Sequence, residues 1–273
     1  MIATFLGTSL LRPAALALQA LLTLGFHLPP SAAQGEGPDL RARFEALDGD
    51  PRDPQAALAV AELWREHPGL TLGVIDSYLE GSLAKFEKHG VEAQAEIAAM
   101  EARALRGAQA ADRAFGTSIF GDYASAFASW NPEEQARFRR GQALYGEASK
   151  ALRAKDPKGA LAKARESLEL ARPLGDWWGS AMALSALARA HGELGEEAQA
   201  LDFAAQARLL NHGLRLLEAE LADLELMLRA AEALGRRERA AEAARAGASL
   251  AEQLKNAAAA QAFGEAQKRL TAK

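Results

Sequence analysis

A forty-residue repeat in the second half of the chain constrains the fold more than any other feature. Each unit has a leucine, an alanine sixteen residues later, and a further alanine after four more residues. The recurring positions are Leu144, Leu184 and Leu224, then Ala160, Ala200 and Ala240, then Ala164, Ala204 and Ala244. Apolar residues three and four apart predict amphipathic helices. A fixed period of this length predicts a solenoid of stacked units.

The clearest unit runs from Leu184 to Ala207 and reads as two helices that reverse at Gly195. The equivalent turn residues in the other units are Lys155 and Gly235. This layout resembles a tetratricopeptide repeat, in which bulky first-helix residues pack around second-helix alanines. The resemblance implies an all-α fold of antiparallel helical hairpins stacked as a right-handed solenoid, whose first helices line a concave surface for a protein or peptide partner.

The resemblance extends from about residue 141 to 254 and departs from the family in two respects. The common period of the family is about thirty-four residues, so the extra residues here require longer helices or longer links, such as 172–176. The tyrosine-like position of the family is occupied by Ala151, His191 and Ala231. Residues 256–270 are expected to form the terminal helix that such stacks require.

Composition agrees with an all-helical protein. Of the 273 residues 49% are apolar, much of this fraction is alanine, and only 6% are aromatic. The formal net charge is −4. Because no basic face is evident, the sequence gives no reason to expect nucleic-acid binding.

Residues 1–33 have the layout of a secretory signal peptide. Arg12 is the only charged residue before Glu36, and an apolar run and the small residues Ser31-Ala32-Ala33 follow it. This pattern predicts cleavage after Ala33 and an exported, periplasmic or extracellular protein without stable membrane insertion; an uncleaved anchor is the alternative. The chain contains no cysteine, which excludes disulfides and a lipid-modified N-terminal cysteine.

Residues 34–131 are expected to form an irregular N-terminal helical region before the repeats of 132–273. Helices are predicted over 39–47, 54–66, 71–88 and 91–113, and consecutive ones are expected to be antiparallel neighbours. Gly121-Asp122-Tyr123 resembles the turn before a second repeat helix, and Asn131-Pro132 is expected to end that helix and cap the next. The glycines at 116 and 121 bracket a loop best explained as a turn between helices.

No catalytic, cofactor or metal motif is found in the sequence, so a non-catalytic protein without a cofactor is predicted. Asp48, Asp50 and Asp53 have some features of a calcium loop, but Arg52 stands at a ligand position, and capping before the two prolines explains them better. Among the isolated histidines, His191 is expected to have a core or interhelix role. His212 is expected to satisfy carbonyls at a helix end.

The family resemblance places one set of first-helix residues on the concave face: Gln142, Tyr145, Ser149, Arg153, Ser185, Arg189, Glu193, Glu225, Arg229 and Glu232. The partner-binding candidates among them are Tyr145, Arg153, Arg189, Glu193, Glu225 and Arg229. Arg189 and Arg229 occupy equivalent positions one repeat apart, and one interpretation is that they receive a carboxylate or an acidic peptide. The slightly favoured interpretation is that Arg189–Glu193 and Glu225–Arg229 are ion pairs on a solvated face.

Trp177 and Trp178 are further candidates. Adjacent indoles point in different directions, so one is expected to hold the link onto the stack. An exposed second indole would be a binding anchor, but the interpretation that both indoles are structural is favoured.

Two functions from different classes are considered, and the sequence favours the first. The first is an exported scaffold that binds a protein or peptide on its concave surface. The second is an exported enzyme or small-ligand protein with a pocket between the N-terminal helices and the repeats, near Tyr123, Phe127, Trp130 and Tyr145. An open groove favours the first, and an enclosed pocket with converging polar groups favours the second.

Overall fold

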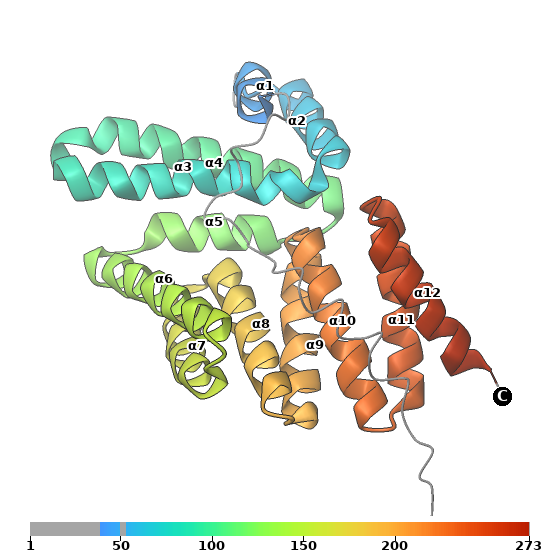
Figure 1. The fold of residues 1–273 in the computed structure, drawn as a ribbon. Coiled ribbons are helices and arrows are strands. Elements are labelled where there is room, and N and C mark those ends of the chain that lie inside the picture. Colours follow the sequence, from blue (N-terminus) through green and yellow to red (C-terminus); the bar gives the residue numbers. More distant parts are fainter. Residues whose placement is uncertain (1–38, 50–52, 273) are drawn as a thin grey trace, which may run out of the picture. The chain divides into compact units, whose positions relative to one another are not determined.

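The computed structural model describes residues 39–49 and 53–272, and every regular element among them is a helix (Figure 1). The predicted all-α fold is therefore confirmed. Residues 37–273 form one compact unit. The expected signal segment and Asp50 of the acidic loop lie outside the described residues. In the described part of the chain, no helix combines the length and the apolar character needed to cross a membrane.

The part of the chain before the repeats folds into α1 (Leu40–Leu47), α2 (Pro54–Glu66), α3 (Pro68–His89), the short 3-10 helix η2 (Gly90–Ala93), α4 (Gln94–Phe115) and α5 (Ile119–Ser129). Asp53 caps α2, which confirms its capping role. Pro68 starts α3 earlier than expected because proline suits the first position of a helix. Helices α3 and α4 form an antiparallel pair, whereas α2 packs chiefly on α4, where the Trp64 indole donates to the carbonyl of Gly107 at 3.0 Å.

The turn expected at Gly121–Tyr123 is wrong. The chain reverses earlier, at Gly116, which has a left-handed φ of 68°. Helix α5 starts at Ile119 because the Asp112 carboxylate on α4 accepts the backbone N–H groups of Phe120 and Gly121 at 3.1 and 2.8 Å. This contact requires a glycine at 121, since a Cβ there would lie 2.6 Å from an oxygen of Asp112. The loop between the glycines is thus a short turn, as expected, but it ends at residue 118.

The repeats comprise α6 (Pro132–Arg153), α7 (Pro157–Ala171), the 3-10 helix η3 (Arg172–Leu174), α8 (Trp177–Glu193), α9 (Glu197–Gly213), α10 (Leu217–Ala233), α11 (Arg237–Gln253) and α12 (Ala257–Thr271). Consecutive helices pack as antiparallel hairpins in a stacked solenoid, as predicted. Asn131 caps α6 in a reciprocal arrangement with Glu134, which confirms the expected start of that helix.

The same turn recurs between all consecutive α-helices from α6 to α12, at intervals of twenty residues. Each turn contains one residue with a positive φ: Lys155, Gly175, Gly195, Arg215, Gly235 and Lys255. The residue after it donates its backbone N–H to the carbonyl five residues earlier, as in Glu196 to His191 at 3.0 Å. Helices α8 to α11 each have 17 residues. The long period therefore comes from long helices, and the links stay short.

The repeat alanines lie where the helices make contact. All six, at 160, 164, 200, 204, 240 and 244, are 0% exposed, and the repeat leucines at 144, 184 and 224 are also buried. A methyl side chain allows two helix backbones to approach closely while the leucines fill the adjoining core. The register predicted from the sequence is confirmed at these positions.

Enlarging one of these alanines is expected to destabilise the fold. Ala200→Leu adds three carbon atoms to a fully packed contact and should lower the free energy of unfolding by about 1–3 kcal/mol. Ala198→Leu is the matched control, because Ala198 is exposed on the same helix and both residues favour helix. Urea unfolding measures both variants. Equal stability of Ala200→Leu and the unchanged protein would contradict the assigned packing.

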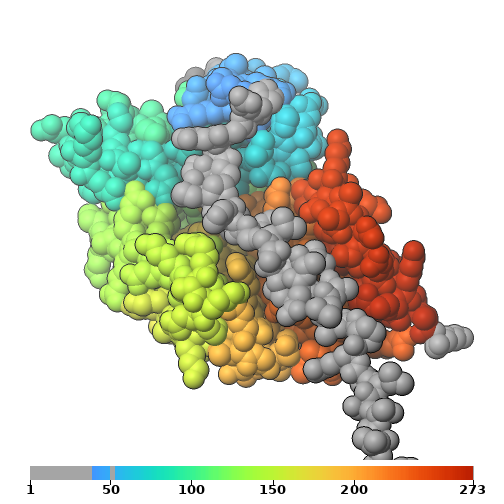
Figure 2. All heavy atoms as spheres, viewed as in Figure 1, coloured from blue at the N-terminus to red at the C-terminus, as the bar shows by residue number. Residues whose placement is uncertain are grey.

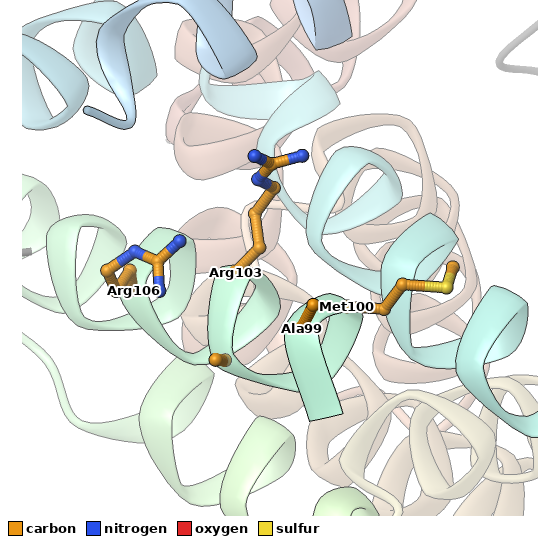
Figure 3. A pocket seen from close by; sticks show the side chains of 5 residues that line it. Ala99, Met100, Arg103 and Arg106 are labelled. Atoms are coloured by element: carbon orange, nitrogen blue, oxygen red, sulfur yellow. The ribbon is translucent and has the colours of Figure 1, made fainter. Parts of the chain in front are cut away.

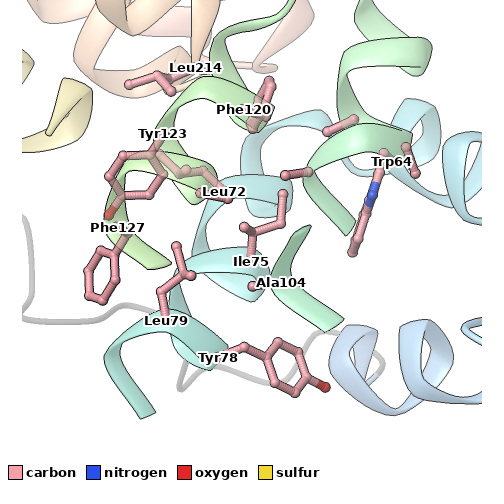
Figure 4. Packing of buried hydrophobic residues seen from close by; sticks show 14 of the residues in the cluster. Trp64, Leu72, Ile75, Tyr78, Leu79, Ala104, Phe120, Tyr123, Phe127 and Leu214 are labelled. Atoms are coloured by element: carbon pink, nitrogen blue, oxygen red, sulfur yellow. The ribbon is translucent and has the colours of Figure 1, made fainter. Parts of the chain in front are cut away.

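The largest aromatic core joins the N-terminal helices to the repeats (Figure 4). Phe120, Tyr123 and Phe127 of α5 belong to the same buried cluster as Leu214, which lies in the turn between α9 and α10. Phe138 of α6 belongs to it as well. The boundary drawn at residue 131 thus separates helices of different regularity, but one core extends across it.

Helix α12 ends the stack, as Figure 2 shows in red. Phe263 and Ala266 are buried against α11, while Gln261 and Lys268 are exposed. Arg237 donates to the carbonyls of Leu270, at 2.7 Å, and Ala272. These bonds satisfy the C-terminal carbonyls of α12 that have no partner within the helix.

Candidate partner-binding surface

The accessible residues of α8 form one narrow stripe. After its first turn the residues that are not buried are Met182, Ser185, Arg189, Gly192 and Glu193. Their spacing of three and four residues places them on one face of the helix. Helix α8 packs against α6, α7, α9 and α10, which cover its other sides. The equivalent residues of α6 and α10 continue the same surface, and we call it the first-helix face.

The candidates on α6 and α10 are accessible to different degrees. Arg153 and Glu225 are exposed, whereas Tyr145 is half-buried against the core formed with α7 and α8. Gln142 donates to Glu80 of α3, and Glu232 pairs with Arg269 of α12 at 3.1 Å. The two ends of the first-helix face are therefore tied to the helices beside them.

The prediction that Arg189 and Arg229 form ion pairs with glutamates on their own helices is wrong. Glu193 instead lies 3.7 Å from the Lys155 ammonium. In the described part of the chain neither Arg189–Glu193 nor Glu225–Arg229 comes within salt-bridge distance. The Arg229 guanidinium reaches over α8 at Gly192, where any side chain would collide with it. Contacts with neighbouring helices, and not the spacing of four residues along one helix, therefore decide where these charged side chains lie.

Ser185 has a structural role that the sequence did not reveal. Its hydroxyl donates to Oδ1 of Asp223 on α10 at 2.9 Å, and the Asn211 amide donates to Oδ2 at 2.7 Å. Asp223 is 1% exposed. Burial raises the pKa of the Asp223 carboxyl to about 7, while the two hydrogen bonds oppose the shift. These three side chains join α8, α9 and α10, so Ser185 is unavailable to a partner.

Both tryptophans of the predicted pair are half-buried. Trp177 and Trp178 pack against the aromatic core shared by the N-terminal helices and the repeats. The first turn of α8 lies against that core, which agrees with the favoured structural interpretation of both indoles and not with an exposed binding anchor. Their contacts are those of structural residues.

The histidines take part in contacts between helices. His191 is buried, stacks on Phe203 with ring centroids 5.3 Å apart, and places Nδ1 2.5 Å from Glu196, which confirms its interhelix role. His212 does not satisfy terminal carbonyls as expected; its Nδ1 lies 3.0 Å from the buried Glu220 carboxylate. Within residues 39–49 and 53–272, no group of three acidic or histidine side chains is arranged to hold a metal ion.

The region proposed for an enclosed pocket is filled by aromatic rings. Tyr123, Phe127 and Trp130 are each buried, and the centroids of Phe127 and Trp130 are 4.3 Å apart. A hollow of about 260 Å³ lies elsewhere, on α4 beside Met100, Arg103 and Arg106 (Figure 3). Arg103 and Arg106 both donate to the Asp48 carboxylate, at 3.0 and 2.7 Å, so these guanidinium groups are already paired.

Comparison with known proteins does not assign the chain to a family. No protein-family model matches the sequence, and no curated protein is significantly similar to it. The functional argument therefore rests on the residues and the fold.

Proposed function

We propose that the chain is an exported, non-catalytic helical-repeat protein, similar to tetratricopeptide repeat proteins, which binds a segment of a protein or peptide partner on the first-helix face. Export is inferred from the signal-like pattern of residues 1–33. The observation that carries the proposal is the regular stack of hairpins, which aligns equivalent residues of α6, α8 and α10 along one surface.

The chemistry of the partner follows from two arginines. Arg189 and Arg229 occupy equivalent positions on neighbouring first helices, and neither has a salt-bridge partner among the described residues. The Nε of Arg229 is buried without a hydrogen-bond partner. Arg153 on α6 adds a third guanidinium, which like that of Arg189 is exposed, whereas Arg229 is half-buried. An extended acidic segment would supply the carboxylates that match these guanidinium groups.

Site-specific photocrosslinking in the source cells tests whether this face is the binding surface. A photoreactive residue at Met182 probes the first-helix face, and one at Ala162, which is exposed on α7, probes the second helices. We expect a discrete adduct with one partner from position 182 and none from position 162. The same adduct from both positions, or one from position 162 alone, would contradict the proposal.

A further inference from the structure

An arginine recurs at one position of three alternate helices in the stack. Arg189 lies on α8, Arg229 on α10 and Arg269 on α12, each forty residues after the one before. Arg269 donates to the Glu232 carboxylate of α10 at 3.1 Å, and this charge-assisted hydrogen bond joins helices one repeat apart. An arginine at this position can therefore reach back to the preceding helix of the series and bind a carboxylate there.

Arg229 also reaches back to the preceding helix, but it meets no carboxylate there. The residue of α8 that corresponds to Glu232, forty positions earlier, is Gly192. Nη2 of Arg229 lies beside Gly192, in the space that a side chain at this position would enter. One unit further back the corresponding residue is Leu152, which is buried and has no side-chain acceptor for Arg189. The repeat thus supplies its own carboxylate in one unit and lacks it in the two units before.

The guanidinium of Arg229 has donors that the described residues do not satisfy. Its Nε is buried and has no hydrogen-bond partner among them, and an unpaired buried donor costs free energy. The glutamates nearest to it in the repeat are not its partners in this part of the chain, since Glu193 lies 3.7 Å from the Lys155 ammonium and Glu225 forms no salt bridge. Gly192 is only half-buried and belongs to the accessible stripe of α8. A carboxylate from outside the chain can therefore approach the guanidinium.

We propose that Gly192 and Arg229 form a subsite for one carboxylate side chain of the bound segment, which takes the part on Arg229 that Glu232 takes on Arg269. The inference rests on the proposed function, because the segment must lie along the first-helix face to reach Gly192. Gly192 is the specificity-determining residue of the subsite. An acidic side chain at this position would pair with Arg229 within the chain, as Glu232 pairs with Arg269, and would exclude the carboxylate of the partner.

Nuclear magnetic resonance of the arginine side chains tests the subsite without knowledge of the partner. The probe is a hexaglutamate peptide with blocked ends, and the Nε–Hε signal of Arg229 is assigned by its loss in Arg229→Ala. In the unchanged protein we expect a saturable shift of this signal with hexaglutamate and none with hexaglutamine. In Gly192→Glu we expect the peptide to bind at least tenfold more weakly. The absence of a saturable shift, or native affinity in Gly192→Glu, would overturn the proposal.

Gly264→Glu is the matched control. It makes the same replacement within a helix and changes the net charge equally, but it lies on α12, where an added Cβ meets no atom within 4 Å. We expect native peptide affinity in this variant, and weakening equal to that of Gly192→Glu would overturn the proposal. The crosslink from Met182 separates the two inferences. A Met182 adduct with native peptide affinity in Gly192→Glu overturns the subsite alone, whereas a missing adduct with weakened affinity overturns the proposed function and supports the carboxylate site.

Discussion

Asp223→Asn is expected to reduce the loss of stability that the unchanged protein suffers between pH 5 and pH 8. Burial raises the pKa of Asp223 to about 7 from an ordinary value of 3.8, so the folded chain holds a proton that the unfolded chain has released. Stability therefore falls with rising pH until the folded group ionises. Between pH 5 and pH 7 the folded chain is protonated at Asp223 and the unfolded chain is not, so the free energy of unfolding falls by about 2–3 kcal/mol over these two pH units. Asparagine does not titrate, and its amide is able to donate to Ser185 while its carbonyl accepts from Asn211.

The loss of stability caused by Asp223 occurs at higher pH than the loss caused by carboxyl groups whose pKa is lowered by the fold. The pKa values of Glu45 and Glu87 are lowered by hydrogen bonds from Tyr78 and Arg139, respectively. Such groups contribute stability above pH 4.5 and lose it below, so they add little change between pH 5 and pH 8. Burial also raises the pKa of Asp76 and Asp176, so both respond in the same direction as Asp223. We therefore expect the Asp223→Asn variant to retain part of the slope.

Urea unfolding at pH 5, 6, 7 and 8 measures the slope for each protein. Asp202→Asn is the matched control, because Asp202 is exposed on α9 and its replacement should leave the pH dependence unchanged. Stability that rises from pH 5 to pH 8 in the unchanged protein, or the same slope in Asp223→Asn, would contradict a raised pKa for the buried Asp223 carboxyl.

The repeat architecture was predictable because its determinants are local. Helix period, the small residues at Ala160, Ala200 and Ala240, and capping by Asn131 are all set within one or two turns of the chain. The turns at Arg215 and Lys255 were harder to find. Neither residue favours the left-handed conformation, and the hydrogen bonds of the helix end impose it.

The candidate surface was only partly predictable, because contacts between distant helices decide the role of each polar residue. Ser185 and Arg189 lie one turn apart on α8, yet one bonds a buried aspartate and the other is exposed. Asp76 and Asp223 look like residues of solvated faces when only helical spacing is considered. Desolvation by packing between α3 and α5 raises the pKa of Asp76, and packing between α8, α9 and α10 raises the pKa of Asp223. No pattern in the sequence marks this packing.

The second large effect is expected for binding. If an acidic segment binds the first-helix face, Arg189→Ala/Arg229→Ala removes two charge-assisted contacts, each contributing on the order of 1.5–3 kcal/mol when shielded from water. Affinity should therefore fall at least tenfold. Neither arginine has a salt-bridge partner among the described residues, so the loss of stability should stay below about 1 kcal/mol. Circular dichroism and thermal melting check that the helices are unaltered.

The most direct test of the partner-binding claim is a titration of the partner segment identified by crosslinking, with the dissociation constant measured for three proteins. Arg165→Ala/Arg245→Ala is the control, because these exposed arginines occupy equivalent positions of the second helices α7 and α11 and their loss changes the net charge equally. We predict native affinity for the control and at least tenfold weaker binding for Arg189→Ala/Arg229→Ala. Native affinity in both variants would contradict binding at the first-helix face through these arginines.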